Sequence, residues 1–127
     1  MLLKYTLSWF GLVLLAILNG GVREHLYKAR LGDLAAHQLS TILLLLLMTT
    51  YVRLLAAAWP LPSIAEAWAI GVIWLMLTLI FEFGFGRFVA GHSWQHLFAE
   101  YNLLAGKIWF LIPLWLLIAP PLLLVPN

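Results

Sequence analysis

Glu82 is the residue whose placement most strongly suggests chemistry, because it puts a carboxylate inside a long apolar stretch. It lies between Phe81 and Phe83, a few positions before Arg87. A charged side chain at membrane depth is costly, so it needs a partner or a purpose. One interpretation is a carboxylate that binds a proton or a cation. The other is an ion pair with Arg23 or Arg87 that holds two helices together. The sequence leaves both open.

Other polar residues gather near the ends of the apolar stretches, where we expect them at one membrane depth. Asn19 and Arg23 are four residues apart and share a helix face. Interface residues are often polar for solvation alone, but Asn19 and Glu82 lie deeper than that explains. We predict one polar cluster that binds an ion or a polar head group. Its candidate members are Asn19, Arg23, Glu24, His37, Gln38, Ser40, Glu82, Arg87, Glu100, Tyr101, Asn102 and Lys107.

A second group has the spacing of metal ligands. His92, His96 and Glu100 follow one another at intervals of four residues, so on a helix they point the same way. Imidazole and carboxylate groups at this spacing can hold zinc or another transition metal. The same residues also form the polar face opposite an apolar stripe that includes Trp94 and Tyr101. We favour the solvated face, and expect no metal and no cofactor.

Motifs of known catalytic machinery are missing, so no catalytic residue is identified. The sequence has no phosphate-binding Gly-rich loop followed by Lys-Ser/Thr, no H-E-x-x-H and no G-x-S-x-G. It also has no cysteine, which excludes thiol catalysis, thiolate zinc sites and disulfides. These absences argue against an enzyme. A lipid-modifying enzyme with Glu82 or His37 as base and an arginine on a phosphate remains an alternative.

The composition predicts the elements that position these residues. The chain has 127 residues, of which 65% are hydrophobic and 9% charged, whereas soluble domains are about 45–50% apolar and about 25% charged. A membrane helix needs about 20 mostly apolar residues. Four stretches qualify, over 5–22, 39–58, 64–85 and 103–125. We therefore predict an all-α polytopic membrane protein with a single four-helix transmembrane domain over residues 1–127.

Local signals mark the ends of these stretches. Ser63 followed by Glu66 is an N-capping pattern at the start of the third stretch. Gly32 and Asp33 can end one helix and begin the next. Apolar residues at helical spacing over 94–101 predict a short interfacial helix before the fourth span.

Basic residues beside the spans predict the orientation, since they are enriched on the cytoplasmic side. Lys4 and Arg53 lie on one side. The other side carries Arg23, Lys28, Arg30, Arg87 and Lys107. We therefore expect the connections 23–36 and 86–102 in the cytoplasm and both termini outside.

Several segments resemble a group of small bacterial four-helix inner-membrane proteins. These segments are Leu18–Glu24 (LNGGVRE), Ala36–Ser40 (AHQLS), Phe81–Gly86 (FEFGFG), Trp94, and Tyr101-Asn102 with Gly106–Trp109 (GKIW). The resemblance implies a bacterial inner-membrane location and attaches no activity. A fainter similarity to ABC-transporter type IV membrane proteins implies an association with transport, although the Trp-Asp-Tyr triplet of that family is absent.

Three functions follow as hypotheses. The polar cluster favours transport, or binding of an ion or a lipid head group. A non-catalytic membrane subunit or scaffold is the first alternative, and the lipid-modifying enzyme is the second. The expected partners are the lipid bilayer and either further copies of the chain or a larger membrane complex. A net charge of +2 without a basic run argues against nucleic acid.

Overall fold

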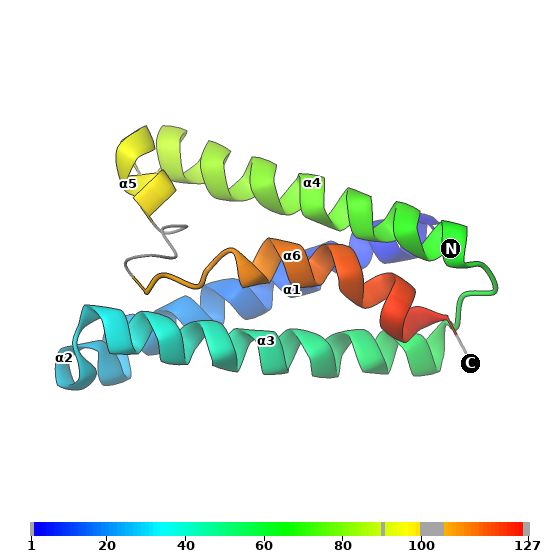
Figure 1. Ribbon diagram of the computed structural model, residues 1–127, viewed down its shortest axis with the longest axis horizontal. Coiled ribbons are helices and arrows are strands. Elements are labelled where there is room, and N and C mark those ends of the chain that lie inside the picture. Colours follow the sequence, from blue (N-terminus) through cyan, green and yellow to red (C-terminus); the bar gives the residue numbers. More distant parts are fainter. Residues whose placement is uncertain (1, 90, 100–105, 126–127) are drawn as a thin grey trace.

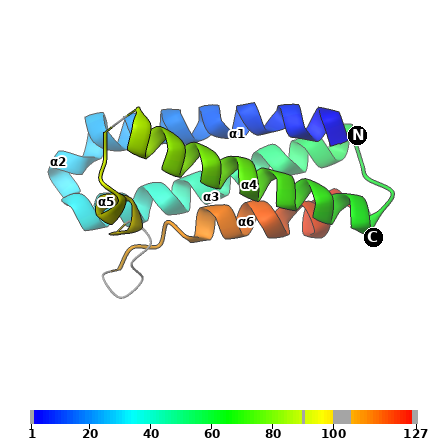
Figure 2. The ribbon, with the colours of Figure 1, turned by 90° about the horizontal axis from the view of Figure 1, so that it is seen from above.

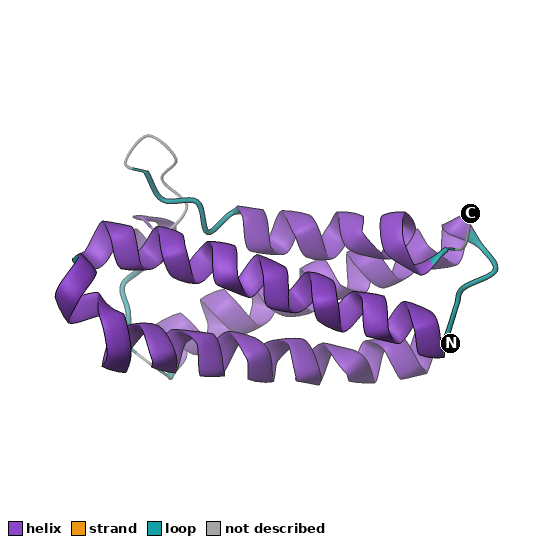
Figure 3. Cartoon of the chain, turned by 90° about the horizontal axis from the view of Figure 1, so that it is seen from below, coloured by secondary structure: helices purple, strands orange, loops and turns teal. Residues whose placement is uncertain are grey.

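The structure is a computed structural model that describes residues 2–89, 91–99 and 106–125. Its longest helices are α1 (Leu2–Val22), α3 (Asp33–Ala58) and α4 (Ile64–Phe88). The shorter ones are η1 (Arg23–Tyr27), α2 (Lys28–Leu31), α5 (Trp94–Ala99), α6 (Leu111–Ala119) and η3 (Pro120–Leu124), where η marks a π-helical turn. No strand occurs in the described ranges (Figure 3). The all-α prediction is confirmed for this part of the chain.

Three helical segments are long and apolar enough to cross a membrane, which suggests a membrane-embedded protein. They are Leu2–Leu31, Asp33–Ala58 and Ile64–Phe88, with 30, 26 and 25 residues. Large apolar side chains such as Phe10 and Ile80 are 63% and 65% exposed on their outer faces. These faces are compatible with contact to lipid. The last apolar helix, Leu111–Leu124, is shorter.

The helices pack into a bundle in which α1 and α6 are diagonal to each other. Both α1 and α6 pack on α3 and on α4 (Figures 1 and 2). In Figure 1, α1 and α4 run in one direction, and α3 and α6 run in the opposite one. Both ends of the described chain therefore lie at one end of the bundle, together with the turn between α3 and α4. The η1, α2 and α5 segments lie at the other end.

Buried aromatic side chains connect the helices through hydrogen bonds. Trp74 Nε1 donates to the Tyr5 carbonyl oxygen at 2.7 Å, and Trp9 Nε1 donates to Thr78 Oγ1 at 3.0 Å. Both pairs are separated by 69 residues in sequence, as parallel packing of α1 on α4 at a fixed register requires. Such hydrogen bonds and close packing hold helices together in a bilayer, where the hydrophobic effect between helices is lost.

The first long connection, predicted over 23–36, is almost entirely helical, because the α1 helix continues through η1 and α2. The predicted change of helix at Gly32 and Asp33 is confirmed: α2 ends at Leu31 and α3 begins at Asp33, six residues before the apolar stretch 39–58. Only Gly32 interrupts, with a φ of 85° that favours glycine. The difference arises because helical hydrogen bonds are local. They continue beyond the point where the sequence stops being apolar.

The last helix begins later than predicted. The fourth span was expected over 103–125, but α6 begins at Leu111, and residues 100–105 lie outside the described ranges. Gly106 has a φ of 84°, which is incompatible with a right-handed helix. Residues 106–110, called the strap below, are non-helical and precede α6. The Gly106 carbonyl oxygen and the Ile108 amide bind side chains of α3, as described in the next subsection.

The predicted cap of α4 is confirmed. Ser63 Oγ accepts a hydrogen bond from the Glu66 amide at 3.3 Å, and Ser63 has extended backbone angles, as an N-cap requires.

Replacing this cap should weaken α4 modestly. Ser63→Ala removes the acceptor for the Glu66 amide, and we expect a loss of about 1 kcal/mol. Thermal unfolding in a nonionic detergent, followed by circular dichroism, measures it as a lower Tm. Ser63→Asp retains an acceptor and should stay near the wild type. Equal Tm values for the alanine and aspartate variants would contradict the capping role.

Candidate functional site

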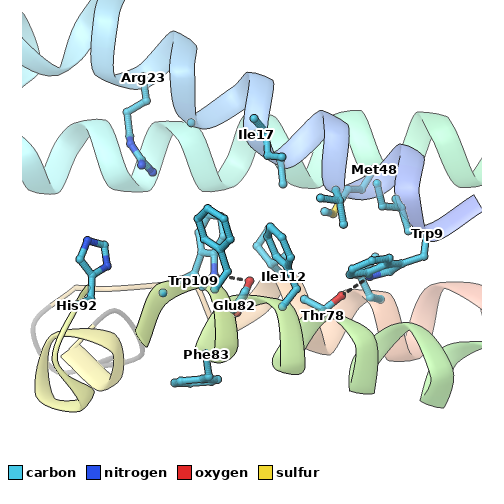
Figure 4. A pocket seen from close by; sticks show the side chains of 18 residues that line it. Trp9, Ile17, Arg23, Met48, Thr78, Glu82, Phe83, His92, Trp109 and Ile112 are labelled. Atoms are coloured by element: carbon cyan, nitrogen blue, oxygen red, sulfur yellow. Dashed lines mark hydrogen bonds between the residues drawn. The ribbon is translucent and has the colours of Figure 1, made fainter. Parts of the chain in front are cut away.

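A cavity of about 350 Å³ lies between α1, α4 and the beginning of α6 (Figure 4). Ile17, Phe85 and His92 line it and are also exposed, so the cavity reaches the molecular surface. The other lining residues are Trp9, Leu12, Val13, Ala16, Gly20, Arg23, Met48, Thr78, Phe81, Glu82, Phe83, Gly86, Trp109, Ile112 and Leu116.

The cavity changes in polarity along its length. Figure 4 shows Trp9 and Met48 at one end, Arg23 and His92 at the other, and Glu82 between them. The deep end is apolar, and its indole N–H is satisfied by Thr78. The charged and titratable side chains lie in the half nearer to η1 and α5. The space is therefore amphipathic, with an apolar interior and a polar mouth.

Asn19 and Arg23 bind the same residue of α3. Asn19 is buried, and its Nδ2 donates to the Ser40 carbonyl oxygen at 2.9 Å. Arg23 Nη1 donates to Ser40 Oγ at 3.2 Å, and Ser40 Oγ in turn donates to the His37 carbonyl oxygen at 3.1 Å. Ser40 therefore connects the polar end of α1 to the beginning of α3. The buried amide of Asn19 thus has the hydrogen-bond partner that a buried polar group needs.

His37 and Gln38 hold the strap through its backbone. The Ile108 amide donates to His37 Nε2 at 3.1 Å, and Gln38 Nε2 donates to the Gly106 carbonyl oxygen at 2.9 Å. An accepting Nε2 requires a neutral imidazole whose proton is on Nδ1. Two adjacent side chains of α3 thus hold the strap at its Gly106 carbonyl oxygen and its Ile108 amide.

Glu82 binds the strap from the opposite side. Its Oε1 accepts a hydrogen bond from Trp109 Nε1 at 2.8 Å, and the Trp109 ring centroid lies 6.4 Å from that of His37. Hydrogen bonds and this ring contact connect α1, α3, the strap and α4 in turn. The structure therefore brings together Asn19, Arg23, His37, Gln38 and Glu82 of the predicted cluster.

The partners predicted for Glu82 are not those seen among its described contacts. Arg23 Nε lies 3.3 Å from Glu24 Oε1, and its guanidinium also binds Ser40. Arg87 lies over the Trp94 ring, 5.9 Å from its centroid. The packing of the helices places Trp109, rather than either arginine, against Glu82.

The remaining candidates lie outside this group or cannot be placed. Glu24 is exposed and pairs with Lys28 at 3.1 Å. Lys107 is a half-buried residue of the strap. Tyr101 and Asn102 lie outside the described ranges.

The predicted preference against a metal at His92, His96 and Glu100 remains a prediction. Glu100 and the side chain of His96 lie outside what the structure describes, while His92 lines the cavity. Among the described residues, no group of three potential ligands gathers around a metal position.

Ser40, a predicted member, has a buried hydroxyl that joins α1 to α3. Trp109, which supplies the donor to Glu82, was not among the predicted members. A tryptophan within an apolar span can be interpreted simply as an interface anchor. The signal that could have identified Trp109 is that a buried indole N–H usually needs an acceptor, and the spans offer few.

Comparison with protein-family models, curated proteins and solved structures found no match to this chain. The resemblance to small bacterial membrane proteins therefore stays a prediction, and the cavity with its polar mouth is the basis for inferring a function.

Proposed function

We propose that the chain is a four-helix integral membrane protein of the bacterial inner membrane that binds an amphipathic ligand in the cavity between α1, α4 and α6. The observation that carries this proposal is the polarity of the cavity, which is apolar around Trp9 and charged at Arg23. Its volume of about 350 Å³ falls within the range of ligand pockets, roughly 300–1,000 Å³. An acyl chain suits the interior, and a polar head group suits the mouth.

The strap supports a fourth membrane span despite the short α6. The α6 and η3 segments have 9 and 5 residues, which at 1.5 Å per residue cover about 21 Å of a hydrocarbon core of about 30 Å. The strap carries the chain on from α6 toward the end of the bundle at which η1 and α2 lie (Figure 1). Non-helical backbone is tolerated at this depth only where protein or water satisfies it. His37 and Gln38 bind two backbone groups of the strap, and amides of α6 bind the carbonyl oxygens of Ile108, Trp109 and Phe110.

The distribution of basic residues supports the predicted orientation. Arg23, Lys28, Arg30, Arg87 and Lys107 belong to η1, α2, the end of α4 and the strap. All of these segments lie at one end of the bundle (Figure 1). Because basic residues are enriched on the cytoplasmic side, this distribution favours an orientation in which that end, and the mouth of the cavity, face the cytoplasm.

Filling the cavity should weaken ligand binding without unfolding the chain. Ala16→Phe places a large side chain in the lining, and we expect binding of lipid to weaken about tenfold or more. Native mass spectrometry of the chain in nonionic detergent measures this with phosphatidylglycerol, phosphatidylethanolamine and phosphatidylcholine as probes. The matched control is Ala57→Phe, which makes the same change at an exposed position of α3 outside the cavity. Equal binding by both variants would contradict the proposed function.

A scaffold is the second candidate, favoured by the number of polar groups that link helices of the same chain. Asn19, His37 and Gln38 each bind a backbone group of another segment. In a scaffold, the cavity is only a packing defect. Ala16→Phe would then leave lipid binding unchanged, and the chain would co-purify with one constant membrane protein.

A further inference from the structure

Building on the proposed function, we infer that the ligand is an anionic phospholipid that inserts one acyl chain into the cavity and places its phosphate between Arg23 and His92. The inference depends on the cavity binding an amphiphile, and adds the class of head group and the orientation of the ligand. Three features of the mouth and the interior carry it.

The first feature is the way Arg23 is held. Its Nε contacts Glu24 and its Nη1 binds Ser40 Oγ, which fixes the guanidinium at the edge of the cavity with its side chain 26% exposed. A guanidinium has five N–H donors, and the described contacts involve Nε and Nη1. A Cβ atom added to Gly20 would lie 3.8 Å from Nη2, so the glycine leaves room beside this nitrogen. A fixed guanidinium with donors to spare matches the geometry of a phosphate.

The second feature is the electrostatic character of the mouth. His92 lies across the mouth from Arg23 (Figure 4), and its backbone is held by a 2.8 Å hydrogen bond from its amide to the Gly86 carbonyl oxygen. An imidazole can donate to a phosphate in either protonation state. The mouth also lies at the end of the bundle that carries most of the basic residues, which favours an anion.

The third feature is the apolar interior below the mouth. Leu12, Val13, Ile112 and Leu116 line it, and Trp9 lies at its deep end with its N–H bound to Thr78. A volume of about 350 Å³ is near the lower limit for ligand pockets, which suits one chain rather than two. The second acyl chain of the lipid would stay in the bilayer beside Ile17, which is exposed as well as lining the cavity.

Glu82 would set the depth of the head group. Its carboxylate lies between the mouth and the apolar interior and is held by Trp109 (Figure 4). A phosphate that moved deeper would approach this side chain, and an ionised carboxyl group there would repel it. The side chain thus excludes the head group from the interior and does not bind it. A site for a cation would instead need Glu82 as a ligand.

The test uses the full chain in nonionic detergent and native mass spectrometry. We expect phosphatidylglycerol to bind more tightly than phosphatidylcholine, and Arg23→Gln to weaken phosphatidylglycerol binding about tenfold or more. Arg87→Gln is the matched control, because Arg87 also lies at this end of the bundle but contacts Trp94 outside the cavity. It should change binding less than about twofold.

Glu82→Gln should retain or strengthen binding. Arg23→Lys keeps the charge, and is expected to bind with intermediate affinity, which guards against misfolding of the glutamine variant.

Each alternative outcome overturns a different step. The head-group assignment would be overturned if Arg23→Gln and Arg87→Gln had equal effects, or if Glu82→Gln lost binding. The proposed function would still stand in that case, provided that Ala16→Phe weakened lipid binding. Inorganic phosphate that bound as tightly as the lipid would assign the site to free phosphate. Lipid binding that survived Ala16→Phe would instead remove the proposed function itself.

Discussion

Gly71→Ala is expected to destabilise the chain strongly, because α4 and α6 touch at this residue. Gly71 is buried, and a Cβ atom there would overlap the Leu117 carbonyl oxygen and lie 3.1 Å from the carbonyl carbon. The obstacle is backbone, so it cannot turn aside as a flexible side chain would. The two helices must move apart, which costs about 1–3 kcal/mol for overpacking of this kind. Small residues at such crossings are what allow membrane helices to pack closely.

The same helix supplies the matched control. A Cβ atom at Gly84 would meet nothing within 4 Å, so Gly84→Ala should be neutral, or should stabilise α4 by up to about 1 kcal/mol through helix propensity. Thermal unfolding in nonionic detergent compares the two variants, and we expect a clearly lower Tm only for Gly71→Ala. Similar Tm values would mean that α4 and α6 do not approach at Gly71 as described.

The second large effect is expected at His37. His37→Leu keeps a buried side chain of similar size but removes the acceptor for the Ile108 amide. The Ile108 residue is half-buried, so leaving its amide without a partner should cost at most the ~1–3 kcal/mol of a fully buried amide. The strap should detach from α3, and the hydrogen bond between Trp109 and Glu82 should weaken with it. The loss would therefore affect one wall of the cavity as well as stability.

Hydrogen–deuterium exchange of the peptide that spans the strap is the direct measurement. The Ile108 amide should exchange faster in His37→Leu than in the wild type, whereas His37→Gln, which retains an acceptor, should protect it at least partly. His25→Leu makes the same change at an exposed residue of η1 and should leave the strap unchanged. Unchanged exchange in His37→Leu would show that the imidazole does not hold the strap.

The sequence predicted well what depends on neighbouring residues. The apolar stretches 5–22 and 64–85 fall within α1 and α4, because the length of an apolar segment limits where a spanning helix can be. The cap at Ser63 was predictable because its partner is only three residues away. The predicted helix bounds were wrong where a helix continues through polar residues or begins later than the apolar stretch. Polar residues continue α1 into α2, and Gly106 with the strap delays α6.

The polar cluster shows the same division. The sequence alone indicates that the few polar residues of the spans lie at the same end of the bundle. It also indicates that they interact, because buried polar groups in an apolar chain must satisfy one another. Which residues meet was decided by the register between helices. Residues of α1 meet residues of α4 that lie 69 positions later in the sequence. The packing of the strap on α3 and α4 brings Trp109, not an arginine, to Glu82. Composition constrains where a residue lies in depth. Only the packed helices determine which side chains face one another, and hence that an apolar space with a polar mouth remains between α1 and α6.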